Sequence, residues 1–309
     1  ANMADTCPHA EVKILTHNLF TPFMGCSDKE ERLEDFANQA AQFDILLCQE
    51  LFVFSLGIFS SGWKHWMVER LKKEGFEYHA VSPVPAVGQC SGLAVFSKFP
   101  IEKFNPDTDF VKYYNWRGVE AWTAKGAMKV KVKVDPKLPS LVCVVTHLQC
   151  MTGPEPFGTR KQQMSQLRSA LLKNKHTNYI ICGDFNVCAI NEPERYLEMK
   201  ATLGDPRDLL LEEALTQLDG EPKSPASTNR PVTCPNIGRV QESLDYAWLR
   251  VPSKEEAASR KKPSAPLWDY LPGSAKVEKL PVSDQRCAVR EGCLSDHFGV
   301  SVILAARPP

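Results

Sequence analysis

Short apolar runs, separated by more polar stretches, recur along the whole chain. They are rich in β-branched and aromatic residues and have the length of strands, which predicts β-structure at 12–20, 44–50, 92–99, 127–134, 141–148, 178–185, 243–250 and 298–305. The run AMKVKVKV alternates between apolar and charged positions, so we expect one buried and one solvent-facing side. The other runs are mostly continuous, which is typical of strands covered on both faces.

Helical patterns lie between several of these runs. Residues 28–43 carry acidic side chains in the first turn and an apolar face, and residues 158–173 carry apolar side chains at helical spacing. The segments 220–240 and 252–274 are rich in Pro, Ser and charged residues, which predicts long surface loops. Because neither an internal repeat nor a linker between two cores is apparent, we predict one α/β domain over residues 1–309.

The charge balance bears on the class of function. The chain has 37 basic and 37 acidic residues, so its formal net charge is zero. Proteins that bind nucleic acid through non-specific phosphate contacts usually carry a basic excess, so that class receives no support and only a local basic patch stays open. No run of about 18 apolar residues occurs, so we expect no transmembrane helix.

The chain contains 11 cysteines, a high number. Cys48, Cys143 and Cys182 lie within apolar runs and are expected to be core thiols. Cys287 and Cys293 could close a short loop, but the odd total argues against a complete disulfide framework.

Polar side chains that suit catalysis or metal binding follow or interrupt the apolar runs. A carboxylate at such a position is costly to bury unless it binds a metal or a partner. One such residue could simply cap a loop, but capping alone hardly explains the whole set, which comprises Asn18, Glu50, His147, Asp184, Asn186, Asp245, Asp296 and His297.

The chemistry that would use this set is metal-assisted attack of water on a phosphodiester. Glu50, helped by the amide of Asn18, offers the hard oxygen ligands that Mg²⁺ and Mn²⁺ prefer. The ion would polarise a phosphate oxygen and offset charge on the leaving group. A histidine beside a carboxylate is a natural base for activating water, and a second carboxylate would fix its tautomer. The residues alone leave open which carboxylate does so.

The ordered set N…QE…H…GDFN…D…SDH, from Asn18 to His297, resembles the endonuclease/exonuclease/phosphatase superfamily, which has the deoxyribonuclease I-like fold. The resemblance implies a four-layered α/β sandwich, in which two mixed β-sheets lie face to face and are flanked by helices. It also implies that Glu50 is the principal metal ligand, with Asn18 nearby and Asp296 supporting the metal environment.

The same resemblance implies roles for the remaining residues. Asp245 would orient His297 as the general base. Asp184 and Asn186 would hold the phosphate or donate a proton near it, and His147 would stabilise the transition state.

Within the superfamily, three stretches resemble the neutral sphingomyelinases. They are GLAVFSKFPI at 92–101, THLQ at 146–149, which ends in Gln149, and WTAKGAMKVKV, which contains Lys125. In eukaryotic members, an aspartate five positions before that lysine is proposed to switch the site. Here that position is Glu120, whose longer side chain leaves the switch open, and the alternative is an ordinary exposed ion pair.

A sphingomyelinase must reach a linkage at the bilayer surface, so exposed aromatic residues are expected near its active site. The candidates for membrane contact follow Glu50 or precede Lys125, and they are Phe52, Phe54, Phe59, Trp63 and Trp116. The glycines and serines among residues 57–62 favour a surface loop. The alternative is that these aromatic residues pack in the core.

The function that these features favour is a Mg²⁺-dependent phosphodiesterase, with Mn²⁺ or Co²⁺ as substitutes, that hydrolyses sphingomyelin to ceramide and phosphocholine. The expected partner is a phospholipid at a membrane surface, with neither nucleic acid nor an obligate protein partner. Such a protein would be soluble and act peripherally at membranes, either in the cytoplasm or after secretion. The alternatives are a nuclease, a phosphoinositide or other phosphoester hydrolase, and an inactive scaffold of the same fold.

Overall fold

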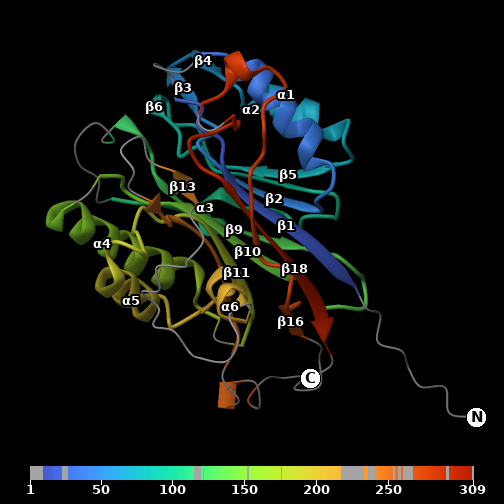
Figure 1. The fold of residues 1–309 in the computed structure, drawn as a ribbon, viewed down its shortest axis with the longest axis vertical. Coiled ribbons are helices and arrows are strands. Elements are labelled where there is room, and N and C mark those ends of the chain that lie inside the picture. Colours follow the sequence, from blue (N-terminus) through green and yellow to red (C-terminus); the bar gives the residue numbers. More distant parts are fainter. Residues whose placement is uncertain are drawn as a thin grey trace, which may run out of the picture.

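Two mixed β-sheets packed face to face form the centre of the molecule (Figure 1). The computed structural model describes residues 10–22, 27–114, 120, 122–151, 153–174, 176–216, 233–235, 241–252, 255–256, 259, 267–289 and 292–307. All structural statements below concern these residues.

The first sheet contains the two ends of the chain. Its strand order is β16 (Leu267–Tyr270), β18 (Gly299–Arg307), β1 (Glu11–Asn18), β2 (Ile45–Gln49), β7 (Ala94–Ser97) and β5 (Tyr78–Val81), with β17 (Lys276–Glu278) also paired to β18. The strands β1 and β2 are parallel, and the other neighbours are antiparallel.

The second sheet is built from the middle of the chain. Its order is β12 (Arg207–Asp208), β15 (Asp245–Arg250), β11 (Tyr179–Asp184), β10 (Leu141–His147), β9 (Gly126–Val132) and β8 (Phe110–Lys112). The strands β10 and β11 are parallel, and the remaining pairs are antiparallel. Each sheet therefore has one central parallel pair whose carboxyl ends point the same way.

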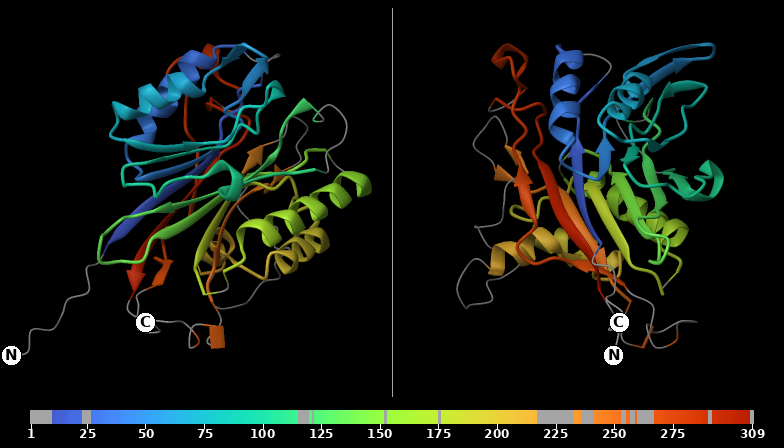
Figure 2. Two further views of the ribbon diagram at one scale, coloured as in Figure 1. Left: turned by 180° about the vertical axis from the view of Figure 1, so that it is seen from behind. Right: turned by 90° about the vertical axis from the view of Figure 1, so that its right-hand side faces the viewer.

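Helices cover the outer face of each sheet (Figure 2). The helices α1 (Lys29–Ala40) and α2 (Lys64–Lys72) pack on the first sheet, and α4 (Pro154–Leu171) and α5 (Pro193–Thr202) pack on the second. The inner faces of the two sheets bury a shared core. Covering both faces removes apolar surface from water on each side, which explains the continuous apolar runs. The predicted four-layered α/β sandwich is confirmed.

The strand β9 tests the alternating pattern directly. Its residues Met128, Val130 and Val132 are buried, whereas Lys129 and Lys131 lie on the outer side. The prediction of one buried and one wet face is confirmed.

Two predicted loops contain secondary structure. The run after Glu50 forms a hairpin of β3 (Val53–Leu56) and β4 (Phe59–Gly62), and β6 (Val87–Gln89) completes a small sheet. The segment predicted as a loop at 252–274 contains β16, so that prediction was wrong for its last part. The segment 220–240 lies mostly outside the described residues, and its described part includes β13 (Cys234–Pro235), which pairs with β14 (Gln241–Glu242).

Shorter elements complete the fold. They are α3 (Pro106–Asp109), α6 (Leu209–Thr216) and the 3₁₀ helix η2 (Gln285–Cys287). The nine described cysteines are all free thiols, which include Cys287 and Cys293. Cys48, Cys143 and Cys182 are fully buried, as predicted. In the part of the chain that the structure describes, no helix has the length and apolarity needed to cross a bilayer.

Candidate active site

The sheet topology brings the polar strand ends together at one edge of the sandwich. Asn18 pairs with Gln49 at the ends of β1 and β2, so Glu50 follows directly, and His147 pairs with Asp184 at the ends of β10 and β11. Because parallel strands end at the same edge, these four side chains meet there. Asn18 joins the two sheets, since its Nδ2 donates to Glu50 Oε1 at 3.0 Å and to Asp184 Oδ2 at 3.3 Å.

A histidine–aspartate pair completes this edge. Asp245 begins β15 and lies opposite Asp184, and His297 lies just before β18. His297 Nδ1 is 2.8 Å from Asp245 Oδ2, and His297 Nε2 is 3.7 Å from Asp184 Oδ2. Among the carboxylates that the sequence left open, Asp245 is therefore the one placed to fix the tautomer, and Nε2 faces the other groups.

Electrostatics around His297 favour its protonated form. Burial alone lowers its pKa, but the negative charges of Asp245 and Asp184 raise it well above the ordinary value. A base that receives a proton next to two carboxylates holds the resulting positive charge at little cost. A raised pKa makes the neutral imidazole a stronger base, so the pair can accept a proton from a bound water in the pH range in which His297 is neutral.

The carboxylates at this edge have unusually high proton affinities. Burial, together with Asp296, raises the pKa of Glu50 to about 7. Burial raises the pKa of Asp184 to about 6, and Asn186 N–H donates to its Oδ1 at 2.8 Å. One carboxylate oxygen of each of Asp184 and Asp245 and one ring nitrogen of His297 lie within 4.8 Å of one another. Crowded buried oxygen ligands fit a hard divalent cation, whose positive charge would offset the repulsion between the carboxylates.

The backbone is also unusual at this edge. Glu50 and Asn186 have φ values of 58° and 52°, which residues other than glycine rarely adopt. Such strain is typical of positions where a side chain is held for function. In the motif GDFN, Gly183 has φ 136°, and a Cβ there would lie 2.0 Å from the carbonyl oxygen of Thr146. The glycine is therefore required for the close pairing of β10 and β11.

Lys125 lies behind His147. Its Nζ is 3.0 Å from His147 Nε2, donates to the Leu148 carbonyl at 2.7 Å and pairs with Glu120 Oε1 at 2.5 Å. The Lys125 side chain is only 2% exposed, so the alternative of an ordinary exposed ion pair was wrong. Burial, the Lys125 charge and His297 lower the pKa of His147 well below its ordinary value, so its imidazole is neutral.

The remaining predicted site residues lie close to this group. The Asp296 carboxylate accepts from Ser295 Oγ at 3.3 Å and is near enough to Glu50 to raise its pKa. Gln149 is buried, and its backbone N–H donates to Gln163 Oε1 on α4 at 2.9 Å. The backbone of Gln149 is bound to α4, and its role in substrate binding stays a prediction.

Comparisons with known proteins agree with this fold. No family model matches the chain. A solved structure described as an endonuclease/exonuclease/phosphatase from Beutenbergia cavernae is similar with a TM-score of 0.61 and 18% identity, over 96% of this chain and 72% of that one. Beta toxin from Staphylococcus aureus, solved with bound magnesium ions, is similar with a TM-score of 0.60 and 17% identity, over 95% and 99%. The chain has the endonuclease/exonuclease/phosphatase fold. A curated sphingomyelinase of Dictyostelium discoideum is 26% identical, over 85% of this chain and 72% of that protein.

Within this fold, the resemblance to neutral sphingomyelinases is supported by the Dictyostelium relative. That relative and the site geometry together support phosphodiesterase activity. The buried Asp184, Asp245 and His297 form a group that could hold a metal ion.

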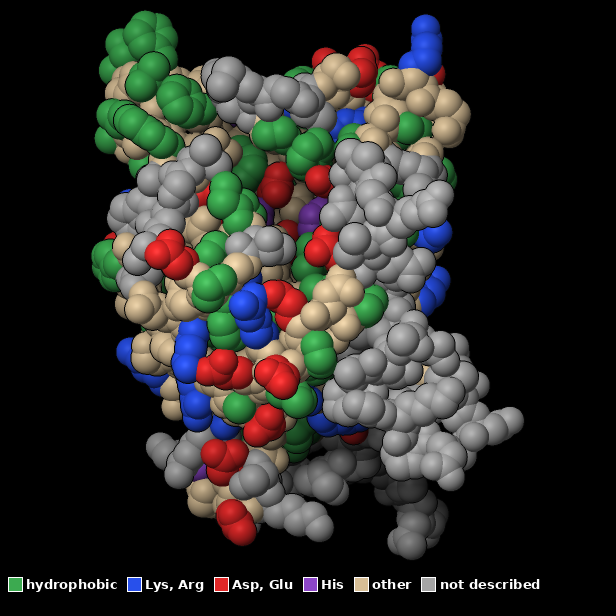
Figure 3. Space-filling model, turned by 60° about the vertical axis from the view of Figure 1, so that its left-hand side comes forward, with side chains coloured by type: hydrophobic (Ala, Val, Ile, Leu, Met, Phe, Trp, Pro, Cys, Tyr) green, Lys and Arg blue, Asp and Glu red, His purple; other side chains and the backbone are tan. Residues whose placement is uncertain are grey.

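The aromatic candidates for membrane contact divide into two kinds. Phe59, at the start of β4, is 74% exposed, and Phe52 and Phe54 are half-buried. Trp63 packs against the core under α1 and α2 and lies edge-on to Trp66, as the core alternative predicts. Trp116 lies outside the described residues. The space-filling view shows hydrophobic side chains protruding at an upper corner, beside a hollow with acidic and histidine side chains on its floor (Figure 3).

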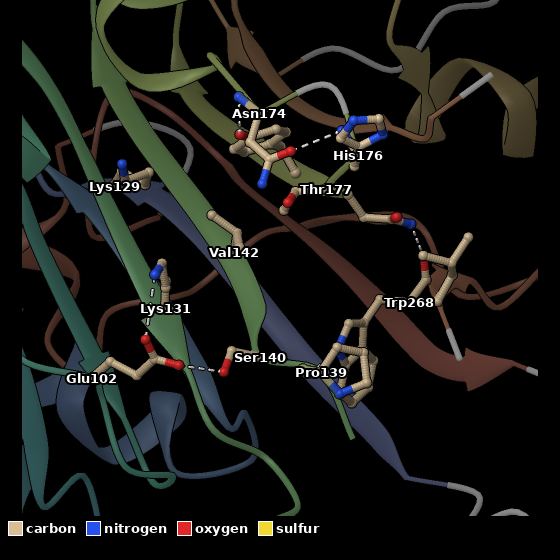
Figure 4. Close-up of a pocket in the computed structure, with 13 residues that line it drawn as sticks. Glu102, Lys129, Lys131, Pro139, Ser140, Val142, Asn174, His176, Thr177 and Trp268 are labelled. Carbon is tan, nitrogen blue, oxygen red and sulfur yellow. Dashed lines mark hydrogen bonds and ion pairs between the residues drawn. The ribbon is translucent and has the colours of Figure 1, made fainter. Parts of the chain in front are cut away.

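A second cavity, of about 420 Å³, lies at the opposite ends of the same strands (Figure 4). Val142 and Tyr179, which pair at the beginning of β10 and β11, belong to its lining. Lys131 and Glu102 form an ion pair of 3.5 Å at its wall. The cavity holds no histidine–aspartate pair and no carboxylate cluster among its lining residues, so it is not the candidate active site.

Sequence reasoning missed residues that support the site from behind. Arg160 on α4 is fully buried and donates from one terminal nitrogen to the carbonyls of Gln149 at 2.9 Å and Met151 at 2.7 Å. Thr233 contacts the backbone next to both members of the histidine–aspartate pair. The one available signal for Arg160 was its place four residues before Met164, on the apolar face of the predicted helix, and no signal marked Thr233.

Proposed function

We propose that this protein is a Mg²⁺-dependent sphingomyelin phosphodiesterase that releases phosphocholine and leaves ceramide. The observation that carries the proposal is the His297–Asp245 hydrogen bond of 2.8 Å beside Asp184, Glu50 and Asn18. This arrangement provides a base, an oriented tautomer and hard oxygen ligands at one edge of the fold. The relative from Dictyostelium, which is a sphingomyelinase, supports the choice of substrate.

The residues that would hold the cation are Glu50 as the principal ligand, with Asn18 alongside and Asp296 in the surroundings. Carboxylate oxygens suit Mg²⁺, and Mn²⁺ or Co²⁺ would be accepted by the same donors. Asn18 would support Glu50, because its Nδ2 donates to the Glu50 carboxylate. A divalent ion bound there would supply Lewis-acid stabilisation of the phosphate oxygens. The raised pKa of Glu50 supports this assignment, because a nearby positive charge would favour its ionised form.

In the proposed reaction, water attacks phosphorus and its proton passes to His297 Nε2. Asp245 keeps Nδ1 protonated and stabilises the imidazolium that forms. The bond between phosphorus and the ceramide oxygen breaks, and that oxygen receives a proton. Asp184 is the candidate donor, because its pKa of about 6 lets it carry a proton near neutral pH.

Two further groups would act on the phosphate. Asn186, held in the left-handed conformation, would position it. Lys125 places a buried positive charge 3.0 Å from His147. This charge would stabilise negative charge that develops on the phosphate in front of the imidazole. Glu120 controls this charge in the proposal, since it pairs with Lys125 and also accepts from the Cys150 N–H at 2.9 Å. Breaking the Glu120–Lys125 pair would therefore change the electrostatic effect of Lys125 on the site and so switch its activity.

In the proposal, the β3–β4 hairpin contacts the membrane. Leu56, Ile58 and Phe59 at its tip are 56%, 93% and 74% exposed, and Val87, which pairs with Leu56, is also exposed. The hairpin follows Glu50 directly in the chain, so an inserted tip would bring the site to the level of the lipid headgroups. Such a cluster of exposed apolar side chains is typical of a membrane or protein contact.

The test is a substrate panel with sphingomyelin in mixed micelles, lysophosphatidylcholine and plasmid DNA, each with Mg²⁺ or EDTA. We expect phosphocholine release from sphingomyelin with Mg²⁺ alone, and a loss of about 10³-fold or more in H297A. The control H65A, on the exposed face of α2, should keep full activity. Nicked DNA together with intact sphingomyelin would support the nuclease alternative and refute the proposal.

Membrane contact is tested with I58S/F59S. This variant should lose binding to sphingomyelin vesicles and activity on them, but keep its activity on a detergent-dispersed substrate. The control L197S replaces another exposed apolar residue, on α5, and should behave as the wild type. Unchanged vesicle binding of I58S/F59S would contradict the role of the hairpin.

A further inference from the structure

Thr233 lies beside both members of the histidine–aspartate pair and is fully buried. Its Oγ1 accepts hydrogen bonds from the backbone N–H groups of Leu244 at 2.9 Å and Asp245 at 3.0 Å. A hydroxyl oxygen has two lone pairs, so one side chain serves both amides at the start of β15. Thr233 therefore holds the backbone from which the Asp245 carboxylate projects.

The main chain of Thr233 holds the other half of the pair. Its carbonyl accepts from the N–H of Phe298 at 2.6 Å, directly after His297, and its own N–H donates to the Glu242 carbonyl at 3.0 Å. The next residue, Cys234, places its Sγ 3.5 Å from the carbonyl oxygen of Asp296, directly before His297. One short segment thus contacts both sides of the pair.

These contacts matter because Asp245 and His297 belong to different sheets. Asp245 begins β15 in the second sheet, and His297 precedes β18 in the first, 52 positions later in the chain. No backbone ladder between β15 and β18 sets the separation of the two side chains. A small shift of one sheet edge relative to the other would lengthen their hydrogen bond of 2.8 Å.

We propose that Thr233 is a positioning residue, which fixes the Asp245–His297 hydrogen bond by binding the backbone of both partners. The consequence for the reaction rests on the proposed phosphodiesterase function. The consequence for the geometry of the pair does not rest on it. Thr233 itself does not touch the reacting atoms in this proposal.

The experiment compares T233V, which removes the hydroxyl at nearly constant volume, with T233S, which keeps it. T202V is the control, since it removes a threonine hydroxyl that donates to the Glu198 carbonyl on the outer helix α5. We expect T233V to lower kcat by about 10- to 100-fold, with KM and the Mg²⁺ activation constant unchanged within about twofold. T233S and T202V should stay within about threefold of the wild type.

A spectroscopic measurement tests the geometry of the pair without relying on turnover. The proton that His297 Nδ1 shares with Asp245 should give a far-downfield proton resonance, assigned by its absence in H297A. It should persist in T233S and T202V and be lost or shifted upfield in T233V. If T233V does not fold, kcat and the downfield resonance are measured in T233A instead.

Normal kcat in a folded T233V, or equal losses in T233S and T233V, would overturn the proposal. An unchanged downfield resonance in T233V would overturn it as well. If the wild type does not hydrolyse sphingomyelin, the proposed function fails, whereas loss of the resonance in T233V alone still supports the positioning role.

Discussion

Replacing Asp245 with asparagine keeps the size of the side chain and removes its charge. In the structure, Asp245 is buried and its Oδ2 is 2.8 Å from His297 Nδ1, while its Oδ1 has no hydrogen-bond partner among the described groups. An asparagine amide that turned its NH₂ group to His297 would favour the wrong tautomer, with the proton on Nε2. The base would then be unable to accept a proton where it faces Asp184.

The size of the effect follows from the role of the pair. Positioned general acid–base groups contribute about 10²- to 10⁴-fold to rate, so we expect kcat to fall by that factor, about 3 to 5 kcal/mol in activation free energy. The pKa of His297 is raised by Asp245 and Asp184, so removal of one charge lowers it. Because the base must be neutral to act, the acid limb of the pH profile should move to lower pH while the plateau falls.

The assay is phosphocholine release at saturating Mg²⁺ from about pH 5 to about pH 9, with kcat and KM separated at each pH. D269N is the matched control, since Asp269 pairs with Arg207 on β12, away from this edge. KM of D245N should change little. A D245N enzyme within about threefold of the wild type, or an acid limb that moves to higher pH, would refute the proposed role of the pair.

Three other predictions test separate parts of the structure. G183A should lower the free energy of unfolding by about 3 kcal/mol in urea titrations, because its Cβ would meet the Thr146 carbonyl oxygen at 2.0 Å. The control G158A, on α4 with open space around its Cβ, should be neutral or slightly stabilising. In EDTA, the free energy of unfolding of the wild type relative to E50Q should fall by up to about 3 kcal/mol as the pH rises from 4.5 to about 7. The reason is that the folded state holds the Glu50 proton more tightly than the unfolded chain does. A difference in stability that does not change with pH contradicts this. K125M should lower kcat by about tenfold or more with little change in KM, and an unchanged kcat contradicts a role for its buried charge.

Much of this architecture could be predicted from the chain. The strand-length apolar runs and the polar residues at their ends gave the sheets and most of the site, because a buried strand that ends in Asn18 or Asp184 needs a reason for its polar end. The alternation of β9 directly predicted its two faces. The family resemblance then assigned Asp245 to His297, which the residues alone left open and the 2.8 Å contact now supports.

Other features depend on contacts between segments that are distant in the chain. The run after Glu50 was predicted as a loop because Gly57 and Gly62 interrupt it, yet pairing with β6 makes it a hairpin. The burial of the Glu120–Lys125 pair depends on how the chain folds over β10, which spacing does not reveal. Thr233 lies in a segment whose composition indicates only a loop, and its hydroxyl becomes important where two sheets meet.

The central claim is that Glu50 holds the cation that sphingomyelin hydrolysis requires. The most direct measurement is phosphocholine release from sphingomyelin as a function of Mg²⁺ concentration, for the wild type and for E50Q, after treatment with EDTA. We predict no turnover in EDTA, saturable recovery of the wild type, and a Mg²⁺ requirement at least about tenfold higher in E50Q, or no recovery. Turnover that persists in EDTA, or identical Mg²⁺ curves for the two proteins, would contradict the claim.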